Sequence, residues 1–305
     1  MRIVFMGTPD IAAQSLRAVI AAGHDVCGVF TREDKPVGRK QIMTAPPVKQ
    51  VAQEFGIPVW QPKTLRDGSA EAVLRELAPE LIVVVAYGRI LPPAVLEIPP
   101  YGCINLHVSL LPKYRGAAPV QWAVLNGDRE TGVTIMQLDE GMDTGDILTV
   151  VPVKIGENET SGELFERISA LGAETLCSTI GNIAHGEIHP VKQDEAAATM
   201  APPLSKEMGE FDFTQDAAHL HNLVRGLNPW PVASFSYQGK RVKVLHSRYS
   251  VLSGEPGTVL SVKPLIVACA AGALCLEEVV PEGSKPMSGE AWAMGRRFSV
   301  GDRIG

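Results

Sequence analysis

The sequence predicts an α/β protein, with a mostly parallel sheet covered by helices on both faces and a small C-terminal β-barrel after it. Three observations predict this fold. Apolar, β-prone runs alternate with helical periodicity over residues 1–189, and the first alternation is a strand–helix–strand unit of about thirty residues. Several short β-prone runs follow within residues 209–305. We therefore expect two domains, joined at 190–208 by an Ala-rich, Pro-bearing linker with little periodicity.

The elements of the first domain follow in order. The run Leu81–Ala86 is apolar throughout, as expected of a strand that is covered on both faces. Gly23 is suited to end the first helix, and Thr160 with Glu163 matches a capping box that opens the last one. Strands are expected at 2–6, 26–30, 58–60, 81–86, 103–107, 132–138 and 147–153, and helices at 11–22, 48–55, 65–77, 117–126 and 160–184.

The second domain has mainly the pattern of strands. One helix is expected at 217–227, and strands are expected at 233–237, 241–245, 257–262, 265–268 and 273–279. Turns separate these short runs, which is typical of a small barrel.

Composition excludes several classes of protein. With 305 residues, of which 45 % are hydrophobic and 20 % charged, the chain suits two globular domains that bury a core. The apolar runs are too short to cross a membrane, and Gly7–Asp10 interrupts the first run before it reaches the length of a secretory signal. The five cysteines include no CxxC pair, which favours reduced thiols. We expect a cytoplasmic monomer that does not use a membrane.

The charge of the chain is unevenly distributed. The net charge of −6 argues against a protein that coats nucleic acid by bulk charge alone. From Gly209 onward, however, ten Lys and Arg residues accompany nine Asp and Glu residues, so the acidic excess belongs to the preceding part. A local basic surface on the C-terminal part is compatible with these counts.

Asn105 and His107 are candidates for catalysis. They are two residues apart on a predicted strand, so both side chains point to one face. An Asn amide can donate to a carbonyl oxygen, and a His, with an ordinary pKa of about 6.5, can stabilise an oxyanion or exchange a proton. Ligands of open α/β sheets bind beyond the carboxyl ends of the strands, where this pair lies. A turn-capping Asn and a core His are the alternative that these two residues leave open.

Asp143 lies in a Gly-rich acidic loop, 138–146, between two predicted strands. A carboxylate there can orient His107 or accept a proton through water. The loop lacks the DxDxDG pattern, so a calcium site is disfavoured. An ordinary acidic turn is the alternative.

Two further segments have functional patterns. Gly7–Asp10 joins a strand to a helix, as a phosphate-binding turn does, but its single glycine favours a structural turn. Residues 31–49 form a long, irregular segment that contains Lys35, Arg39 and Lys40. Basic residues on such a segment suit phosphate contacts, and a solvated charged loop is equally compatible with the composition.

Together these residues resemble the formyltransferase family that uses 10-formyltetrahydrofolate, and within it the branch that acts on methionyl-tRNA. Each motif alone is weak, but the ordered set is highly specific and runs along nearly the whole chain. The motifs are Phe5-Met-Gly-Thr-Pro-Asp10, Val85-Ala-Tyr-Gly88, Asn105-Leu-His107, Ser109-Leu-Leu-Pro-Lys-Tyr-Arg-Gly116, Gly132-Val-Thr-Ile-Met136, Asp143-Thr-Gly-Asp146, Leu204-Ser-Lys-Glu207 and Asn228-Pro-Trp-Pro231. The last two lie outside the first domain and are similar to the tRNA-dependent enzymes in particular.

The resemblance implies a Rossmann-like catalytic domain at 1–189 and a tRNA-binding barrel resembling an OB fold at 209–305. It implies transfer of formyl from 10-formyltetrahydrofolate to the α-amino group of methionine on initiator tRNA, with no metal. Asn105 and His107 would hold the carbonyl oxygen, while Asp143 would orient His107 and relay the proton. The folate site would be lined by Ser109, Leu110, Leu111 and Pro112, with Arg89, Ile90 and Leu91 near the pterin through backbone groups, and the tRNA would contact Arg39, Lys40 and Lys35.

The sequence departs from the family pattern at two places. Val108 follows His107 where a small residue, usually Gly, is common, and the loop Gly38–Met43 lacks a second Gly after its Arg. The second departure leaves open which basic residue makes the main tRNA contact.

Other functions compete with this interpretation. The chain could formylate a free small amine, such as glycinamide ribonucleotide or an amino sugar nucleotide, or it could hydrolyse or oxidise the formyl folate. The C-terminal module argues against these functions. The missing GxGxxG pattern argues against a nucleotide-binding dehydrogenase, and the Asn–His–Asp trio argues against a non-catalytic nucleotide- or RNA-binding protein.

Overall fold

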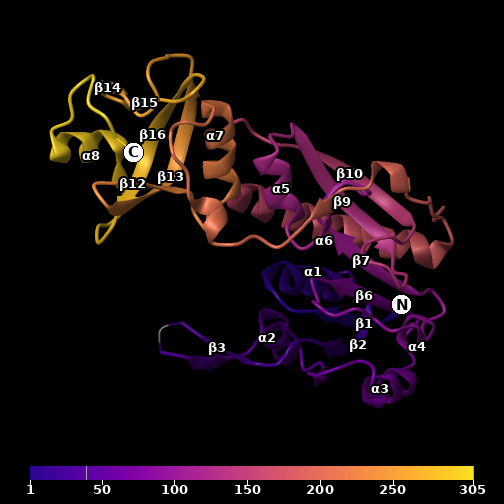
Figure 1. The fold of residues 1–305 in the computed structure, drawn as a ribbon. Helices are drawn as coiled ribbons and strands as arrows, with labels where there is room; N and C mark the ends of the chain where they lie inside the picture. Colours follow the sequence, from indigo (N-terminus) through magenta and orange to yellow (C-terminus); the bar gives the residue numbers. More distant parts are fainter. Residues whose placement is uncertain (39, 305) are drawn as a thin grey trace. The chain divides into compact units, whose positions relative to one another are not determined.

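The computed structural model describes residues 1–38 and 40–304, and this part of the chain forms two compact units (Figure 1). The first unit comprises Met1–Gly116, Gly132–Val153 and Glu166–Met200. The second comprises Ala117–Thr131, Lys154–Phe165 and the chain from Ala201 onward. The chain therefore passes between the units several times instead of completing one before the other begins.

The first unit is built on a seven-stranded sheet in the order β10-β9-β7-β6-β1-β2-β5. Neighbouring strands from β7 to β5 run parallel, and β9 is antiparallel to β7. The mostly parallel α/β sheet expected from the sequence is thus confirmed. The strands are β1 (Arg2–Gly7), β2 (Asp25–Phe30), β5 (Val59–Trp60), β6 (Leu81–Val85), β7 (Cys103–His107), β9 (Glu130–Gln137) and β10 (Ile147–Lys154).

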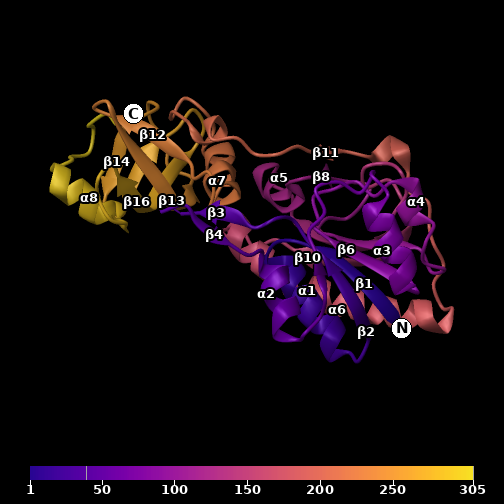
Figure 2. The same cartoon turned by 90° about the horizontal axis from the view of Figure 1, so that it is seen from below.

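Helices cover both faces of this sheet, and they surround the parallel strands in Figures 1 and 2. Val4 and Met6 of β1 pack in one core cluster with Leu74 of α3. Phe5 alternates to the opposite face, where α1 approaches so closely that a Cβ on Gly7 would lie 2.6 Å from the Ala12 Cβ and 2.9 Å from the Phe5 ring. The helices are α1 (Asp10–Ala21), α2 (Pro47–Glu54), α3 (Ser69–Leu77), α4 (Pro93–Leu96) and α6 (Ser161–His185).

The order of the strands identifies the edge where a ligand is expected. From β1 the chain proceeds to β2 and β5 on one side, and it then returns to place β6 and β7 on the other side. This reversal makes the carboxyl ends of β1 and β6 the topological switch point, where open α/β sheets bind their ligands. The polar residues of β7 end on the same edge, because β6 and β7 are parallel neighbours.

The second unit contains an antiparallel sheet in the order β12-β13-β16-β15-β14, with β17 paired to β16. The antiparallel C-terminal architecture expected from the sequence is confirmed, although β12 and β14 lie at opposite ends of the sheet and do not close a barrel within the described chain. The strands are β12 (Ser234–Tyr237), β13 (Lys240–Ser250), β14 (Val259–Val262), β15 (Leu265–Ala268), β16 (Ala273–Pro281) and β17 (Met287–Ser288), and the helices are α5 (Pro119–Leu125), α7 (Ala217–Gly226) and α8 (Gly289–Arg296).

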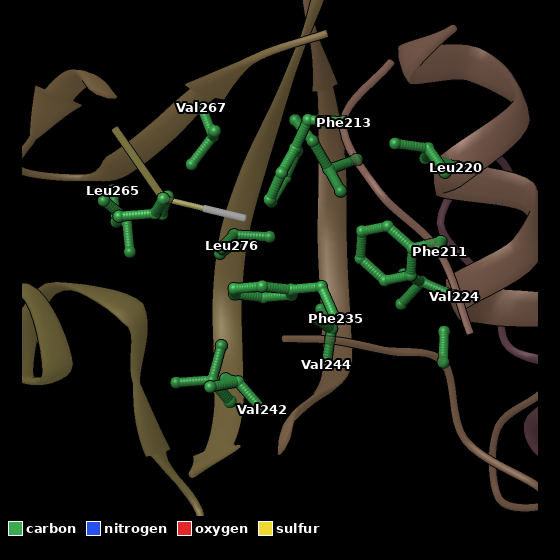
Figure 3. Packing of buried hydrophobic residues seen from close by; sticks show 14 of the residues in the cluster. Phe211, Phe213, Leu220, Val224, Phe235, Val242, Val244, Leu265, Val267 and Leu276 are labelled. Atoms are coloured by element: carbon green, nitrogen blue, oxygen red, sulfur yellow. The ribbon is translucent and has the colours of Figure 1, made fainter. Parts of the chain in front are cut away.

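An aromatic cluster forms the core of the second unit (Figure 3). The centre of the Phe235 ring lies 5.1 Å from that of Phe213 and 5.9 Å from that of Trp292, both in edge-on geometry. The Phe211 ring packs against the rings of Phe213 and Phe235. Leu220 of α7 belongs to the same cluster. Edge-on aromatic pairs each add about 0.5–1.5 kcal/mol to the burial of their apolar area, so this cluster stabilises a small unit effectively.

Several elements differ from the expected ranges for clear reasons. Helix α3 begins at Ser69 and not at residue 65, because Gly68 adopts a φ of +81°, which an α-helix cannot include. The segment expected to be irregular contains a hairpin of β3 (Lys35–Val37) and β4 (Ile42–Thr44). The sequence also did not indicate the helices α4 and α8 or the strand β17. It likewise did not indicate the short strands β8 (Arg115–Gly116) and β11 (Met200–Ala201) or the 3₁₀ turns Glu195–Ala197 and Glu207–Gly209.

Two properties of the whole chain complete the description. Among the described residues, no helix combines the length and the apolar character that a membrane span requires. All five cysteines are free thiols, and Cys103 and Cys269 are buried.

Candidate active site

Strand β7 brings Asn105 and His107 to one edge of the sheet. Asn105 pairs in register with Val84 of β6, and His107 lies opposite Thr134 of β9. The two side chains share a face with Cys103, which belongs to the core beneath α3 and α4. His107 is only 6 % exposed, whereas Asn105 is half-buried. The expected juxtaposition of an amide and an imidazole at the carboxyl end of this strand is therefore present.

The hydrogen bonds of His107 define its protonation. Its Nε2 lies 2.9 Å from the carbonyl oxygen of Tyr114. Because a carbonyl oxygen only accepts, Nε2 carries the hydrogen and donates it. Burial lowers the pKa of His107 below its ordinary value, against the opposing influence of the Asp143 carboxylate and the Tyr114 carbonyl. The ring is therefore neutral at pH 7, with an unprotonated Nδ1.

Asp143 faces that nitrogen. Its Oδ2 lies 3.6 Å from His107 Nδ1 and accepts a hydrogen bond of 2.8 Å from the backbone N–H of Gly116. The Asp143 backbone has a φ of +55°, which is rare for residues other than Gly, Asn and Asp. Residues with a left-handed backbone conformation are found often at functional sites.

The pair forms a place that can hold one added proton. An unprotonated Nδ1 and a carboxylate face each other across 3.6 Å, with no hydrogen between them in the neutral state. A proton delivered there would become a charge-assisted hydrogen bond between the two groups. The arrangement thus fits a reaction that releases a proton from a nucleophile, and Asn105 supplies an amide donor on the same strand face.

The loop around Asp143 is held by close backbone packing and by local hydrogen bonds. A Cβ on Gly145 would lie 1.8 Å from the Gln137 carbonyl oxygen, so only glycine fits there. Asp139 accepts hydrogen bonds from Gly141 N–H at 3.0 Å and from the Thr144 hydroxyl at 2.7 Å. These contacts fix the path of the loop without using the Asp143 carboxylate.

Gln193 contributes to the same site from the segment expected to be a linker. Its amide nitrogen donates to the carbonyl oxygens of Asp143 and Gly145, both at 2.8 Å. Its side-chain oxygen accepts two hydrogen bonds from Arg115, which also pairs with Glu195 at 2.7 Å. Gln193 is 9 % exposed and Arg115 is 5 % exposed. Sequence reasoning missed Gln193 because a lone Gln in an aperiodic stretch has no pattern that distinguishes it.

The turn after β7 is held by hydrogen bonds within the turn and by Thr134 of the neighbouring strand β9. The Ser109 hydroxyl, fully buried, donates to the Lys113 carbonyl oxygen at 2.6 Å. Thr134 of β9 donates to the Ser109 carbonyl oxygen at 2.7 Å and accepts from Leu111 N–H at 3.2 Å. The predicted folate-lining residues Ser109, Leu110, Leu111 and Pro112 therefore lie on a rigid turn directly beyond the Asn105–His107 pair.

The loop after β6 carries the other predicted folate contacts. Ile90 is 59 % exposed, Leu91 is buried in the core beneath α3 and α4, and Arg89 is half-buried. Because β6 and β7 are parallel neighbours, this loop and the turn at Ser109–Pro112 begin from the same edge of the sheet. The exposed apolar side chain of Ile90 at this edge suits a planar heteroaromatic ring.

The predicted tRNA contacts lie on the β3–β4 hairpin, which stands away from the parallel sheet (Figure 1). Lys35 pairs in register with Thr44, and both strands are exposed along their whole length. Lys40 is also exposed. Arg39, the third predicted contact, lies outside the described residues. Within 1–38 and 40–304, no group of three His, Cys, Asp or Glu residues is arranged to hold a metal ion.

Comparison with known proteins extends over the whole chain. Residues 1–180 match the family model described as "Formyl transferase", and residues 203–297 match "Formyl transferase, C-terminal domain". A methionyl-tRNA formyltransferase of Geobacter metallireducens is 46 % identical over 100 % of this chain and 99 % of its own length. One from Alkaliphilus oremlandii is 44 % identical, with 100 % of both chains covered.

Solved structures resemble the fold. An N-formyltransferase from Helicobacter canadensis, in complex with folinic acid and dTDP-3-aminofucose, has a TM-score of 0.68. The match covers 93 % of this chain and 99 % of that one, at 19 % sequence identity. At this identity the likeness concerns the fold, and it agrees with the sheet and the C-terminal unit described above.

Proposed function

The chain belongs to the formyl transferase family, and from this premise we propose that it transfers a formyl group from 10-formyltetrahydrofolate to the α-amino group of methionine on initiator tRNA. The observation that carries the proposal is the full-length similarity, above 40 % identity, to methionyl-tRNA formyltransferases, which includes the C-terminal domain. A family member acting on a free small amine would not require that agreement along the whole chain.

The loops that follow β6 and β7, at the carboxyl ends of these strands, are suited to bind the folate. When bound, 10-formyltetrahydrofolate supplies a formyl group on its N10 nitrogen. The loop at Arg89–Leu91 would hold the pterin through backbone groups, with Ile90 offering apolar surface. Ser109, Leu110, Leu111 and Pro112 would line the opposite side, because their turn begins where β7 ends. The fit rests on the shared edge of β6 and β7 and on the exposed apolar side chain of Ile90.

Asn105 and His107 act on the formyl oxygen. The amide of Asn105 donates a hydrogen bond to an oxygen that gains negative charge as the amine attacks. His107, once protonated on Nδ1, adds a positive charge beside it. The cost of burying that charge is offset by Asp143, whose carboxylate lies 3.6 Å away.

Asp143 and His107 together accept the proton that the attacking amine loses, and this proton passes to the folate N10 nitrogen when its bond to the formyl carbon breaks. His107 Nε2 is already committed to the Tyr114 carbonyl oxygen, so the imidazole can gain a proton only on Nδ1, which faces the carboxylate. Asp143 therefore has two tasks, because it keeps the ring oriented and shares the added proton. The Gly116 N–H that binds its Oδ2 holds the carboxylate in place for both.

The tRNA would be held outside this site. Lys35, Arg39 and Lys40 belong to the hairpin segment and would contact backbone phosphates. The domain at 209–305, less acidic than the rest, would bind the tRNA body, while residues 1–189 catalyse and 190–208 connect the two. We propose that the enzyme works as a cytoplasmic monomer.

The deciding experiment incubates the protein with formyltetrahydrofolate and methionyl-initiator tRNA and measures N-formylmethionine released after hydrolysis of the ester. Parallel reactions offer glycinamide ribonucleotide or an amino sugar nucleotide as acceptor. We expect product with the charged tRNA alone. Turnover of a free amine without formylation of the tRNA would refute the proposal.

A further inference from the structure

A second polar cluster lies at the switch point of the sheet, outside the proton-holding pair. Thr31 and Arg32 directly follow β2, and Tyr87 and Arg89 follow β6. Strand β1 lies between these two strands, and its last residues reach the same edge, where the Thr8 hydroxyl donates to the Tyr87 carbonyl oxygen at 3.3 Å. Arg32, Tyr87 and Arg89 thus come together from two segments more than fifty residues apart in the sequence.

The guanidinium groups of Arg32 and Arg89 both lie near the Glu33 carboxylate, at distances longer than those of strong hydrogen bonds. Arg89 Nη2 lies 3.4 Å from both oxygens of Glu33, and Arg32 Nε lies 3.8 Å from one of them. Charge-assisted hydrogen bonds are ordinarily about 2.7–2.9 Å long. The neighbouring Asp34 is engaged elsewhere, since it binds Lys49 at 2.8 Å. Two positive charges therefore face one negative charge at this edge.

Several donors of the cluster are buried without a hydrogen-bond partner among the described residues. They include Arg32 Nε, Arg89 Nε and the Thr31 hydroxyl, and the buried Tyr87 hydroxyl lies beside the Arg89 side chain. Thr31 is fully buried and Tyr87 is 1 % exposed. Leaving a buried polar group unpaired costs about 1–3 kcal/mol, and more for a charged group. The two arginine donors, which lie near one carboxylate and beside the buried Tyr87 side chain, indicate a site that binds an anion with several acceptor oxygens.

The position of the cluster indicates which anion. Arg32 is three residues before Lys35, where the exposed β3–β4 hairpin begins. Arg32 also donates to the Gly88 carbonyl oxygen at 2.8 Å, which anchors it beside the loop after β6. Lys35, Arg32 and Arg89 therefore mark a path from the hairpin to the switch point of the sheet, with the carboxylates of Glu33 and Asp34 among them. A nucleic-acid strand that enters along the hairpin would place a phosphate there.

We propose that Arg32 and Arg89 bind a backbone phosphate near the 3′ end of the tRNA, and this inference rests on the proposed function. Planar guanidinium groups bind phosphate oxygens through paired hydrogen bonds, which a loosely held Glu33 does not satisfy. Glu33 occupies the site between reaction cycles and is displaced by the phosphate. Binding of the tRNA end thereby satisfies donors that the free protein leaves unpaired.

The test measures the Kd for methionyl-tRNA by fluorescence anisotropy over a range of salt concentrations, together with both KM values. For Arg32→Gln and for Arg89→Gln we expect a rise in the tRNA Kd of about tenfold and a salt slope reduced by about one. The KM for formyltetrahydrofolate stays unchanged in Arg32→Gln, because Arg32 has no part in the predicted folate site. Glu33→Gln removes the competing carboxylate, so it should tighten tRNA binding by about threefold at low salt.

Arg17→Gln is the matched control, because Arg17 is an exposed arginine of the same unit that pairs with Glu54. It should leave the Kd and the salt slope unchanged, and thermal unfolding verifies that every variant is folded. If the wild type formylates the tRNA but the Arg32 and Arg89 variants bind it normally, the inference is overturned while the proposed function stands. A raised KM for the folate with a normal tRNA Kd would overturn it too, since the pair would then serve the folate carboxylates.

Discussion

The Asp143–His107 pair and the β3–β4 hairpin are built in opposite ways. His107 and Asp143 are 6 % and 16 % exposed, and the contacts that fix them come from Tyr114, Gly116 and Gln193. Both strands of the hairpin are exposed along their length and, among the described residues, form a two-stranded sheet of their own. In the proposed function, the first region would hold atoms in place for a reaction, whereas the second would present charge to the tRNA. Changes in the first should therefore lower kcat, and changes in the second should raise the KM for tRNA.

The largest effect is expected for Asp143→Asn. Asn tolerates the positive φ and keeps an acceptor for the Gly116 N–H, so the fold should persist. The proton-holding pair is lost, and kcat should fall by about 10²- to 10⁴-fold. Stopped-flow or quench-flow kinetics measures kcat, and thermal unfolding checks the fold.

The pH dependence of kcat in Asp143→Asn gives a second test of the role of Asp143. Asp143 raises the pKa of His107 against the lowering effect of burial. Without the carboxylate the pKa of His107 should fall further, and the acid limb of the residual activity should move to lower pH, because neutral His107 is the active form. Glu140→Gln, an exposed charge change in the same loop, is the control and should be silent. An Asp143→Asn enzyme with normal kcat would remove this residue from the mechanism.

A smaller loss of kcat is expected for Gln193→Glu. The substituted side chain still accepts hydrogen bonds from Arg115 but no longer donates to the carbonyl oxygens of Asp143 and Gly145. The Asp143 loop should shift slightly, and displacements of about 1 Å can cost on the order of 100-fold in rate. We expect kcat to fall about 10- to 100-fold with both KM values nearly constant, as steady-state kinetics would measure.

Asp194→Asn is the control for Gln193→Glu. It tests whether the loss of kcat depends on the hydrogen bonds of Gln193 or follows from any substitution in this segment. Asp194 is the next residue in the chain, and its carboxylate only caps the 3₁₀ turn at Glu195–Ala197. Its replacement should leave kcat unchanged. If Gln193→Glu instead raised a KM and spared kcat, Gln193 would hold a binding surface and not the proton site.

The sequence predicted those parts of the molecule that depend on local pattern. The strand at residues 103–107 was expected with the bounds it has, and Thr160 with Glu163 forms the expected capping box, since the Thr160 N–H and hydroxyl both donate to the Glu163 carboxylate at 2.8 Å. Period-two alternation likewise places Asn105 and His107 on one face of their strand. Such patterns are set by the nearest neighbours in the chain.

The contacts that join distant segments could not be predicted in this way. Gln193 reaches Asp143 across a separation of fifty residues, and its surroundings have no periodicity. Arg32 and Arg89 meet only because β2 and β6 flank β1 in the sheet. The hairpin was also missed as structure, since its strands of three residues are too short for an alternation to register.

The smallest effects are expected for Lys35→Ala and Lys40→Ala. Both lysine side chains are exposed. Each substitution therefore removes one phosphate contact that salt already screens, and it disturbs no packing. The KM for methionyl-tRNA should rise about two- to fivefold near physiological salt, with kcat and the KM for the folate unchanged, and the salt slope of binding should fall by about one per residue. Lys63→Ala, an exposed lysine of the same unit outside the hairpin, is the matched control. A lowered kcat with an unchanged KM for tRNA in the hairpin variants would contradict the assignment of catalysis to the Asp143–His107 pair and of tRNA binding to the hairpin. The hairpin would then act on the reacting groups themselves.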